Sequence, residues 1–353
     1  MLSSEEIVFA REGGLARITL NRPKALNALN LNMAERAIAQ LADWAEDPEV
    51  AAVIIDGVGE TAFCAGGDIR AIYSSATGDG RHAADFFRAE YTLNRAIFHF
   101  PKPYLALIDG ITMGGGVGLS VHGSHRVATE RTKLAMPETG IGLFPDVGAS
   151  YVLPRLPGRL GLYIGLTGAR LSAADCLATG LATHYLPHEK LLALTGAVAA
   201  ADWTSDASGH ADEVLARFAT DPGPSTLLEN EAEIDRCFAG DSVEEILSAL
   251  EADGSDWAER TLAQLSGRSP SSLKITFEAY RRGAKMDFDD VMVMEYRLSQ
   301  ACVAGHDFPE GIRAVIIDKD NKPDWRPATL AEVGEEALAR SFGPQSVSDL
   351  SFD

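Results

Sequence analysis

Two carboxylates stand eight residues apart in an apolar, glycine-rich stretch of the chain. They are Glu138 and Asp146, within Met-Pro-Glu-Thr-Gly-Ile-Gly-Leu-Phe-Pro-Asp-Val-Gly at residues 136–148. A carboxylate is costly to bury among Met, Ile, Leu and Phe unless it is paired or used. Such surroundings can keep one carboxyl protonated and another ionised, as general acid–base catalysis requires. Two loop carboxylates that cap helices are the structural alternative.

A triple glycine could offer backbone N–H groups to a ligand. Gly114, Gly115 and Gly116 follow an apolar run and lead into helix-like sequence. N–H groups at a helix N-terminus favour an anion or a developing oxyanion. The dinucleotide-binding fingerprint fails because Leu119 stands where its third glycine belongs, and the Gly-Lys-Ser/Thr of a P-loop is absent. Glycines that serve only close strand–helix packing are the alternative.

A second glycine segment reads Phe-Cys-Ala-Gly-Gly-Asp-Ile at residues 63–69. Its two glycines allow the backbone to approach a ligand closely. We expect Asp68 to cap the helix that follows. A plain turn with a helix cap is the alternative role of the segment.

The chain is acidic and has the composition of a globular protein. Its 353 residues include 31 Lys+Arg and 51 Asp+Glu, which gives a net charge of −20. This charge argues against nucleic acid as a partner, because phosphates need a basic face. The most apolar window, residues 104–121, contains Asp109 and five glycines. We therefore expect a buried strand and turn there and no membrane span.

The cysteines indicate a reducing compartment. Cys64, Cys176, Cys237 and Cys302 lie far apart without a CxxC pair, and the eight histidines show no metal-binding spacing. We therefore expect reduced thiols, no disulfide and no metal site. The first residues are acidic, and strand-like sequence begins by about Ile7, so we expect no signal or transit peptide. The resulting expectation is a cytoplasmic protein.

Strands, glycine loops and helices alternate along the first part of the chain, which predicts an α/β core with stacked sheets. The expected strands are 6–10, 15–20, 50–55, 104–108, 126–129 and 133–136. The expected helices are 33–44, with Asn32 as its N-cap, 86–98 and 117–122.

After about residue 186 the sequence becomes mainly helical. The expected helices are 213–218, 226–237, 243–252, 257–265 and 272–282. We expect two domains, a core at 1–200 and a helical C-terminal subdomain or lid at 201–353. No fixed-period repeat or heptad pattern is present.

The order of these glycine and carboxylate segments resembles the crotonase (enoyl-CoA hydratase/isomerase) superfamily over about residues 5–200. The resemblance implies a spiral of ββα units, an acyl-CoA substrate and an oxyanion hole formed by the amides of Gly67 and Gly115. The segment Leu-Asn-Arg-Pro-Lys-Ala-Leu-Asn-Ala-Leu at 20–29 matches the loop that contacts CoA in this superfamily. Further substrate-binding positions follow from the match: Lys24 for a phosphate, the backbone of Ala25 and Leu26 for adenine, and Ala65, Asp68 and Ile69.

One exchange separates this chain from the hydratases of the superfamily, which use two glutamates. Gly118 occupies the first of those positions and Glu138 the second, and Asp146 stands where hydratases have glycine. The exchange resembles the branch that hydrolyses 3-hydroxyisobutyryl-CoA. The run at 307–320 also matches that branch, so the resemblance covers nearly the full chain. In this branch, Glu90 corresponds to a residue that binds the acyl end.

The resemblance implies hydrolysis of 3-hydroxyisobutyryl-CoA and related short β-hydroxyacyl-CoAs to the free acid and CoA, a step of valine breakdown. Glu138 would attack the carbonyl or act as general base on water. Asp146 would orient the water, protonate the leaving thiolate or bind the substrate's hydroxyl. No cofactor is expected, since CoA is part of the substrate. A homo-oligomer is compatible with the resemblance. An enoyl-CoA hydratase or isomerase and a catalytically silent acyl-CoA-binding protein are the alternatives.

Overall fold

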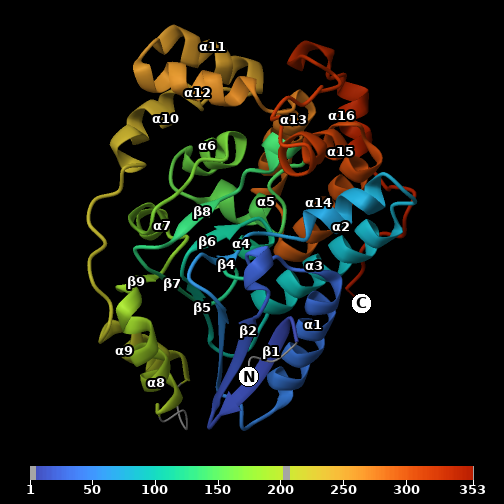
Figure 1. Cartoon of the computed structure of the whole chain (residues 1–353). Coiled ribbons are helices and arrows are strands. Elements are labelled where there is room, and N and C mark those ends of the chain that lie inside the picture. The colour runs from blue at the N-terminus through green and yellow to red at the C-terminus, as the bar shows by residue number, and fades with distance from the viewer. Residues whose placement is uncertain (1–4, 202–206, 353) are drawn as a thin grey trace. The chain divides into compact units, whose positions relative to one another are not determined.

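The computed structural model describes residues 5–201 and 207–352 and combines two β-sheets with many helices (Figure 1). The expected α/β fold with a helical C-terminal region is confirmed. The chain forms two compact units: unit 1 comprises 1–67, 92–134 and 171–228, and unit 2 comprises 68–91, 135–170 and 229–353. Each unit is built from three separate stretches of the chain. The predicted division at residue 200, between a family core and a helical C-terminal subdomain, is a different kind of division and stays a prediction. The extreme N-terminal residues 1–4, on which the expectation about targeting segments partly rests, lie outside the described residues.

The strands are β1 (Ile7–Glu12), β2 (Leu15–Leu20), β3 (Ala52–Gly57), β4 (Ala62–Cys64), β5 (Tyr104–Ile108), β6 (Ile111–Met113), β7 (His125–Ala128), β8 (Lys133–Ala135) and β9 (His184–Tyr185). The α-helices are α1 (Leu31–Glu46), α2 (Ile69–Ala76), α3 (Arg81–Phe98), α4 (Gly115–Gly118), α5 (Ala149–Val152), α6 (Leu160–Thr167), α7 (Ala173–Thr179), α8 (Leu191–Ala199), α9 (Ala207–Ala216), α10 (Glu231–Cys237), α11 (Val243–Asp253), α12 (Asp256–Ser266), α13 (Pro270–Gly283), α14 (Phe288–Ala304), α15 (Asp307–Ile312) and α16 (Glu335–Ser341). Short 3₁₀ or π turns are η1 (Pro23–Ala25), η2 (Glu138–Ile141), η3 (Leu153–Arg155), η4 (His188–Lys190), η5 (Leu228–Asn230), η6 (Arg313–Ile317) and η7 (Leu330–Glu332).

The larger sheet, in unit 1, has the order β1-β2-β3-β5-β7-β9. Only β1 and β2 are antiparallel, as the expected hairpin requires, and they turn at Gly13, whose φ of +58° suits glycine. The remaining pairs are parallel. Residues 52–55 of β3 are all buried, which explains their continuous apolar run. Apolar residues of this sheet, such as Leu105, pack with Leu194 and Val198 of α8.

Helix α1 begins at Leu31, two residues earlier than expected. Asn30, and not Asn32, is the N-cap, because its side chain accepts a hydrogen bond from the Met33 N–H at 2.9 Å. The helix lies along β1 (Figure 1), and the rings of Phe9 and Trp44 meet edge to face with centroids 5.8 Å apart. A hydrophobic face at helical spacing therefore fixes α1 on the hairpin.

The smaller sheet has the order β4-β6-β8, and it positions both glycine segments. Strands β4 and β6 run parallel, with Cys64 opposite Thr112. Helix α4 starts at Gly115, directly after β6, and has only four residues, so the expected helix at 117–122 is wrong in its bounds. A Cβ at Gly116 would overlap the carbonyl oxygen of Cys64, so only glycine allows this close approach.

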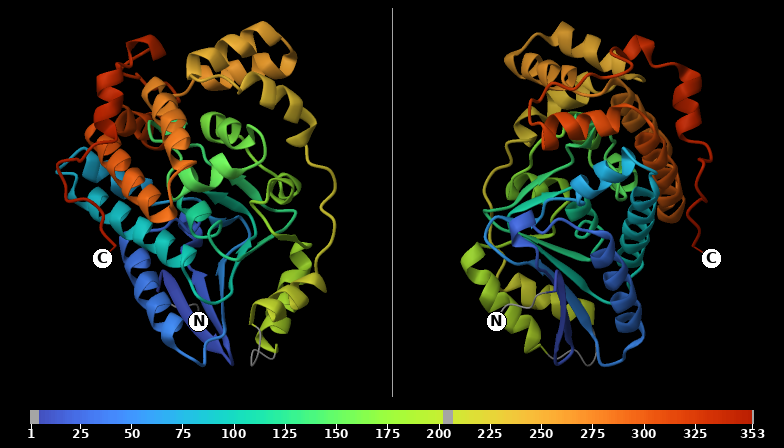
Figure 2. Two further views of the ribbon diagram at one scale, coloured as in Figure 1. Left: turned by 180° about the vertical axis from the view of Figure 1, so that it is seen from behind. Right: turned by 45° about the vertical axis from the view of Figure 1, so that its right-hand side comes forward.

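Unit 2 contains α2, the first part of α3, the segment with Glu138 and Asp146, and the C-terminal helices. Helices α11 and α12 pack side by side, as both views of Figure 2 show, and each has a serine N-cap, Ser242 and Ser255. Helices α13 and α14 likewise begin at the caps Ser269 and Asp287. The sequence analysis does not predict α14, whose apolar residues show no single clear stripe.

The described residues also bear on the expected thiols, membrane spans and metal sites. All four cysteines are free and buried. In the part of the chain that the structure describes, no helix is at once long and apolar enough to cross a membrane. Among the same residues, no group of three or more His, Cys, Asp or Glu side chains could hold a metal ion.

The glycine at 116 provides a test of the smaller sheet. We expect Gly116→Ala to lower the free energy of unfolding by about 1–3 kcal/mol, because the methyl group has no space beside Cys64. Gly196→Ala in α8 is the matched control, since its methyl group would meet no atom within 4 Å and alanine favours a helix. Denaturant unfolding followed by circular dichroism measures both. Equal stability of the two variants would contradict the packing argument.

Candidate active site

Unit 2 brings three of the sequence-predicted carboxyls into one buried cluster. Glu90 comes from α3, Glu138 begins η2, and Asp146 lies in the loop before α5. Glu90, Glu138 and Asp146 are only 2%, 5% and 4% exposed, respectively. A fourth buried carboxyl, that of Glu295 in α14, joins them and was not predicted.

Burial raises the pKa of every carboxyl in this cluster. Burial is the largest cause at each carboxyl, and the charge of Asp146 adds to it at Glu90, Glu138 and Glu295. The pKa of Asp146 rises to about 6, and that of Glu295 to about 8. The pKa values of Glu90 and Glu138 lie well above the ordinary range. These carboxyls therefore keep a proton to a higher pH than exposed carboxyls do, and Asp146 is protonated in part of the molecules near neutral pH, a state that acid–base chemistry can use.

Asp146 has a defined hydrogen-bond partner in this cluster. The Tyr91 hydroxyl donates to Asp146 Oδ2 at 2.6 Å. This bond stabilises the carboxylate and lowers the pKa of Asp146, against the larger effect of burial. Tyr91 itself is fully buried, and its ring packs edge to face on Tyr296 at 6.4 Å. The donor is therefore fixed before any ligand arrives.

Glu138 has a different environment, because one of its carboxyl oxygens makes no hydrogen bond to any residue that the structure describes. The positive charge of Arg268 lowers the pKa of Glu138 against burial and the charge of Asp146. Arg268 donates to the Thr167 carbonyl, and its guanidinium fills the space where Gly140 would carry a Cβ. The Tyr280 hydroxyl is also buried and has no hydrogen-bond partner among the described residues, and burial, followed by the charge of Glu138, raises its pKa. These orphaned polar atoms mark the place where a ligand or water would complete the hydrogen bonding.

Unit 1 carries the two predicted oxyanion amides. Gly67 follows β4 and Gly115 follows β6, and these strands are neighbours. A Cβ at Gly66 would lie 3.9 Å from the Gly115 nitrogen, so the two glycine segments lie next to each other. Gly115 opens α4, and the first N–H groups of a helix have no partner within the helix. Both predicted amides therefore belong to one small region of this unit.

The predicted CoA-contacting loop lies in the same unit. Lys24 and Ala25 belong to η1, and Leu26 follows with φ of +51° and an exposed side chain. Ala65 donates its N–H to the Leu26 carbonyl at 3.0 Å, which joins this loop to the first glycine segment. In unit 2, Asp68 caps α2 through Ala71 N–H, as expected, and Ile69 is the first residue of that helix.

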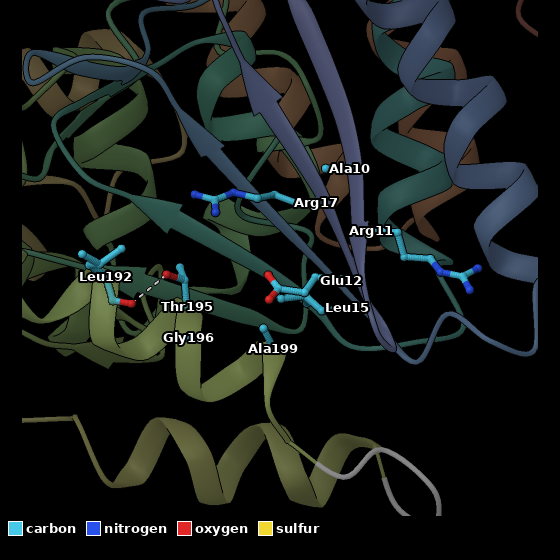
Figure 3. Close-up of a pocket in the computed structure, with 9 residues that line it drawn as sticks. All are labelled: Ala10, Arg11, Glu12, Leu15, Arg17, Leu192, Thr195, Gly196 and Ala199. Carbon is cyan, nitrogen blue, oxygen red and sulfur yellow. Dashed lines mark hydrogen bonds between the residues drawn. The ribbon is translucent and has the colours of Figure 1, made fainter. Parts of the chain in front are cut away.

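A pocket of about 460 Å³ in unit 1 is separate from these residues (Figure 3). It lies between the β1–β2 hairpin and α8, and Arg17 and Leu192 are among the residues that line it. None of the residues lining this pocket is a predicted site residue. This pocket is therefore not the predicted acyl-CoA site.

The sequence analysis missed Tyr91, Arg268, Tyr280 and Glu295. Tyr91 directly follows Glu90, but adjacent helical residues point in different directions. Their adjacency in the sequence therefore did not indicate that both side chains belong to the site. Glu295 stands in the run Val-Met-Val-Met-Glu-Tyr at 291–296, where one carboxyl among apolar residues is a signal of a buried charge. Arg268 and Tyr280 meet the site only through long-range packing.

The raised pKa of Asp146 makes a prediction about stability. A carboxyl whose pKa is higher in the folded state favours folding at low pH, and this contribution is lost as the pH rises through the folded pKa of about 6. Asp146→Asn cannot ionise. Its free energy of unfolding, relative to the unsubstituted protein, should therefore rise by about 1–2 kcal/mol between pH 5 and pH 7.5. Urea unfolding at both pH values measures this difference.

Asp290→Asn is the control for that measurement, because Asp290 is an exposed aspartate on α14. Its difference from the unsubstituted protein should stay the same at both pH values. A pH-independent difference for Asp146→Asn would show that Asp146 is not held in a buried, charge-rich site.

Relatives with curated names cover nearly the whole chain. The chain is 52% identical to the mitochondrial 3-hydroxyisobutyryl-CoA hydrolase of Xenopus laevis, over 97% of this chain and 90% of the relative. It is 49% identical to the human protein of the same name, over 99% of this chain and 92% of the relative.

These names correct one expectation. The curated relatives are named mitochondrial, so the prediction of a cytoplasmic protein is wrong. Free, buried cysteines fit any compartment that keeps thiols reduced, so they could not distinguish the two locations.

Solved structures and a family model agree with the relatives on the family. A carnitinyl-CoA dehydratase from Mycobacterium thermoresistibile has a TM-score of 0.92 at 45% identity, and the match covers 99% of both chains. An enoyl-CoA hydratase from Rhodobacter sphaeroides has a TM-score of 0.90 at 38% identity, covering 99% of this chain and 100% of that one. The model described as "Enoyl-CoA hydratase/isomerase" matches residues 15–342. The chain thus belongs to the enoyl-CoA hydratase/isomerase (crotonase) family and, within it, to the 3-hydroxyisobutyryl-CoA hydrolase branch.

Proposed function

We propose that this chain hydrolyses the thioester of 3-hydroxyisobutyryl-CoA to the free acid and CoA, as a step of valine breakdown. The observation that carries the proposal is the buried pair of Glu138 and Asp146 in a chain about half identical to hydrolases of that name. A thioester hydrolase needs a group that promotes attack on the carbonyl carbon and a group that handles the proton of the leaving thiol. Two carboxyls in different environments meet that need.

In this proposal, Glu138 promotes the attack. Its carboxylate either bonds to the carbonyl carbon, expelling CoA thiolate and leaving a mixed anhydride that water then cleaves, or it takes a proton from the attacking water. The carboxyl oxygen of Glu138 that makes no hydrogen bond is available for either step. Arg268 favours the ionised form that both routes require.

Asp146 is the acid of the proposed reaction. With a pKa of about 6 it carries a proton in part of the molecules near neutral pH, and it can give that proton to the thiolate sulfur of CoA. The bond from Tyr91 then stabilises the aspartate that remains. Glu90, which holds its proton more firmly, is proposed to donate a hydrogen bond to the acyl end.

The proposed oxyanion donors are the N–H groups of Gly67 and Gly115. Negative charge develops on the thioester oxygen, and one such donor is worth about 3–4 kcal/mol. Lys24, Ala25, Leu26, Ala65, Asp68 and Ile69 are proposed to bind the CoA part and the adjoining acyl group. The proposal requires no metal and no cofactor besides the CoA of the substrate.

A second candidate is an enoyl-CoA hydratase or dehydratase, because the two full-length structural neighbours are described as such enzymes. Gly118 disfavours it, since hydratases of this family carry a glutamate at that position and a glycine supplies no acid or base. A silent acyl-CoA-binding protein is disfavoured by the cost of burying four carboxyls without using them.

An acyl-CoA panel tests the proposal. We expect release of free CoA thiol from 3-hydroxyisobutyryl-CoA, slower or equal release from 3-hydroxypropionyl-CoA, and no loss of the enoyl absorbance of crotonyl-CoA. Hydration of crotonyl-CoA without thiol release from either hydroxyacyl-CoA would overturn the proposal in favour of a hydratase. Binding of CoA without any turnover would favour the silent binding protein.

The role of Glu138 has its own test. We expect Glu138→Gln to lower kcat by about 10²–10⁴, because an amide can neither attack nor take a proton. Titration calorimetry should show CoA binding within about threefold of the unsubstituted protein. Glu259→Gln, which removes an exposed carboxyl of α12, should leave both quantities unchanged. Unchanged turnover in Glu138→Gln would show that this carboxyl is structural.

A further inference from the structure

The loop that carries Asp146 has a strained backbone. Val147 has φ of +52°, and Gly148 has φ of +87°. Glycine adopts such angles readily, but a β-branched valine in this region is a genuine outlier. A strained residue of this kind persists only where its surroundings hold it, and such residues cluster at functional sites. The question is therefore what holds the loop directly after Asp146.

The carboxyl of Glu295 holds it from α14. One oxygen, Oε2, accepts the N–H of Gly148 at 2.7 Å, and the other, Oε1, accepts the N–H of Ser150 at 2.9 Å. Glu295 is 0% exposed, so this two-point contact is made out of reach of bulk water. Burying a carboxyl is costly, and a pair of well-matched amide donors offsets that cost.

The same loop is held from a second element. The Tyr91 hydroxyl of α3 bonds to the side chain of Asp146 itself, and the Ala149 N–H donates to the Asp146 carbonyl at 2.9 Å. The carboxyl of Asp146 is thus fixed directly by a hydroxyl, and its backbone is fixed by Glu295 two and four residues further on. Removing Glu295 would leave the strained Val147 without this constraint.

We propose that Glu295 is a positioning residue for catalysis. It holds the Asp146 carboxyl in its catalytic position by accepting hydrogen bonds from the backbone N–H groups of Gly148 and Ser150. The proposal rests on the proposed function, in which Asp146 handles the proton of the leaving thiol. Glu295 acts through the loop and does not itself need to touch the substrate.

The charged and titratable groups around Glu295 come from several elements. Asp146 faces it from the loop, Glu90 and Tyr91 from α3, and Tyr280 from α13. Burial and the charge of Asp146 raise the pKa of Glu295 to about 8. Both protonation states present two oxygens to the loop, whereas a glutamine presents one oxygen and sets an NH₂ group against the other N–H.

The test compares Glu295→Gln, Asp146→Asn and the double variant in thiol release from 3-hydroxyisobutyryl-CoA. We expect Glu295→Gln to lower kcat by about 10–100-fold and to change KM by less than about threefold, because a displaced catalytic group costs rate. In the double variant, kcat should be no more than about threefold below that of Asp146→Asn, since the two residues act as one unit. Asp290→Asn, on the same helix and exposed, is the control that keeps full activity.

Circular dichroism establishes that each variant is folded. If Glu295→Gln is not, Glu295→Asp takes its place, because it keeps the carboxyl and shortens the reach by one methylene. A folded Glu295 variant with undiminished kcat would overturn the positioning role, as would a double variant whose loss is the product of the two single losses. A lack of thiol release by the unsubstituted enzyme would instead overturn the proposed function, and the positioning role with it.

Discussion

Four carboxyl groups without bulk water around them are the constraint on which unit 2 depends. These carboxyls come from three segments that are far apart in the chain: Glu90 from α3, Glu138 and Asp146 from one stretch, and Glu295 from α14, and all four are buried. They cannot all be ionised together, because each charge opposes the others and none is solvated. Their titration is therefore shared, and the cluster stores protons at a pH at which isolated carboxylates would have lost them.

The residues from 268 to 308 supply much of the support for this cluster. Ser269 donates its N–H to the Thr139 carbonyl at 3.1 Å, next to Glu138. A Cβ at Gly142 would overlap the backbone of Asp307, so α15 meets the end of η2 without space for a side chain. Glu295 holds the segment that follows Asp146. The C-terminal helices thus do more than cover the carboxyl segment, since they fix its backbone at several points.

The sequence predicts the parts of this protein that depend on local chemistry. Glycine and asparagine turns, strand runs and the Asp68 cap follow from residue types, and the order of the motifs indicates the family. The sequence does not predict contacts that depend on packing between distant helices. The roles of three residues depend on such distant contacts. Tyr91 contacts Asp146, 55 positions away; Arg268 acts on Glu138, 130 positions away; and Glu295 contacts Gly148, 147 positions away. Even the N-cap of α1 was predicted two positions too late, at Asn32 instead of Asn30, because the two nearby asparagines offer the same cap chemistry.

The buried cysteines have a consequence for work with thiol reagents. A thiolate, and not a thiol, reacts with disulfide reagents and alkylating agents. Burial raises the pKa of Cys302 to about 12, and it raises the pKa of Cys176 and Cys237 as well. The cysteines of the native enzyme should consequently react very little with a chromogenic disulfide at neutral pH. CoA set free in the same cuvette, with its exposed thiol, would then account for the whole signal, and colour contributed by the protein would report unfolding.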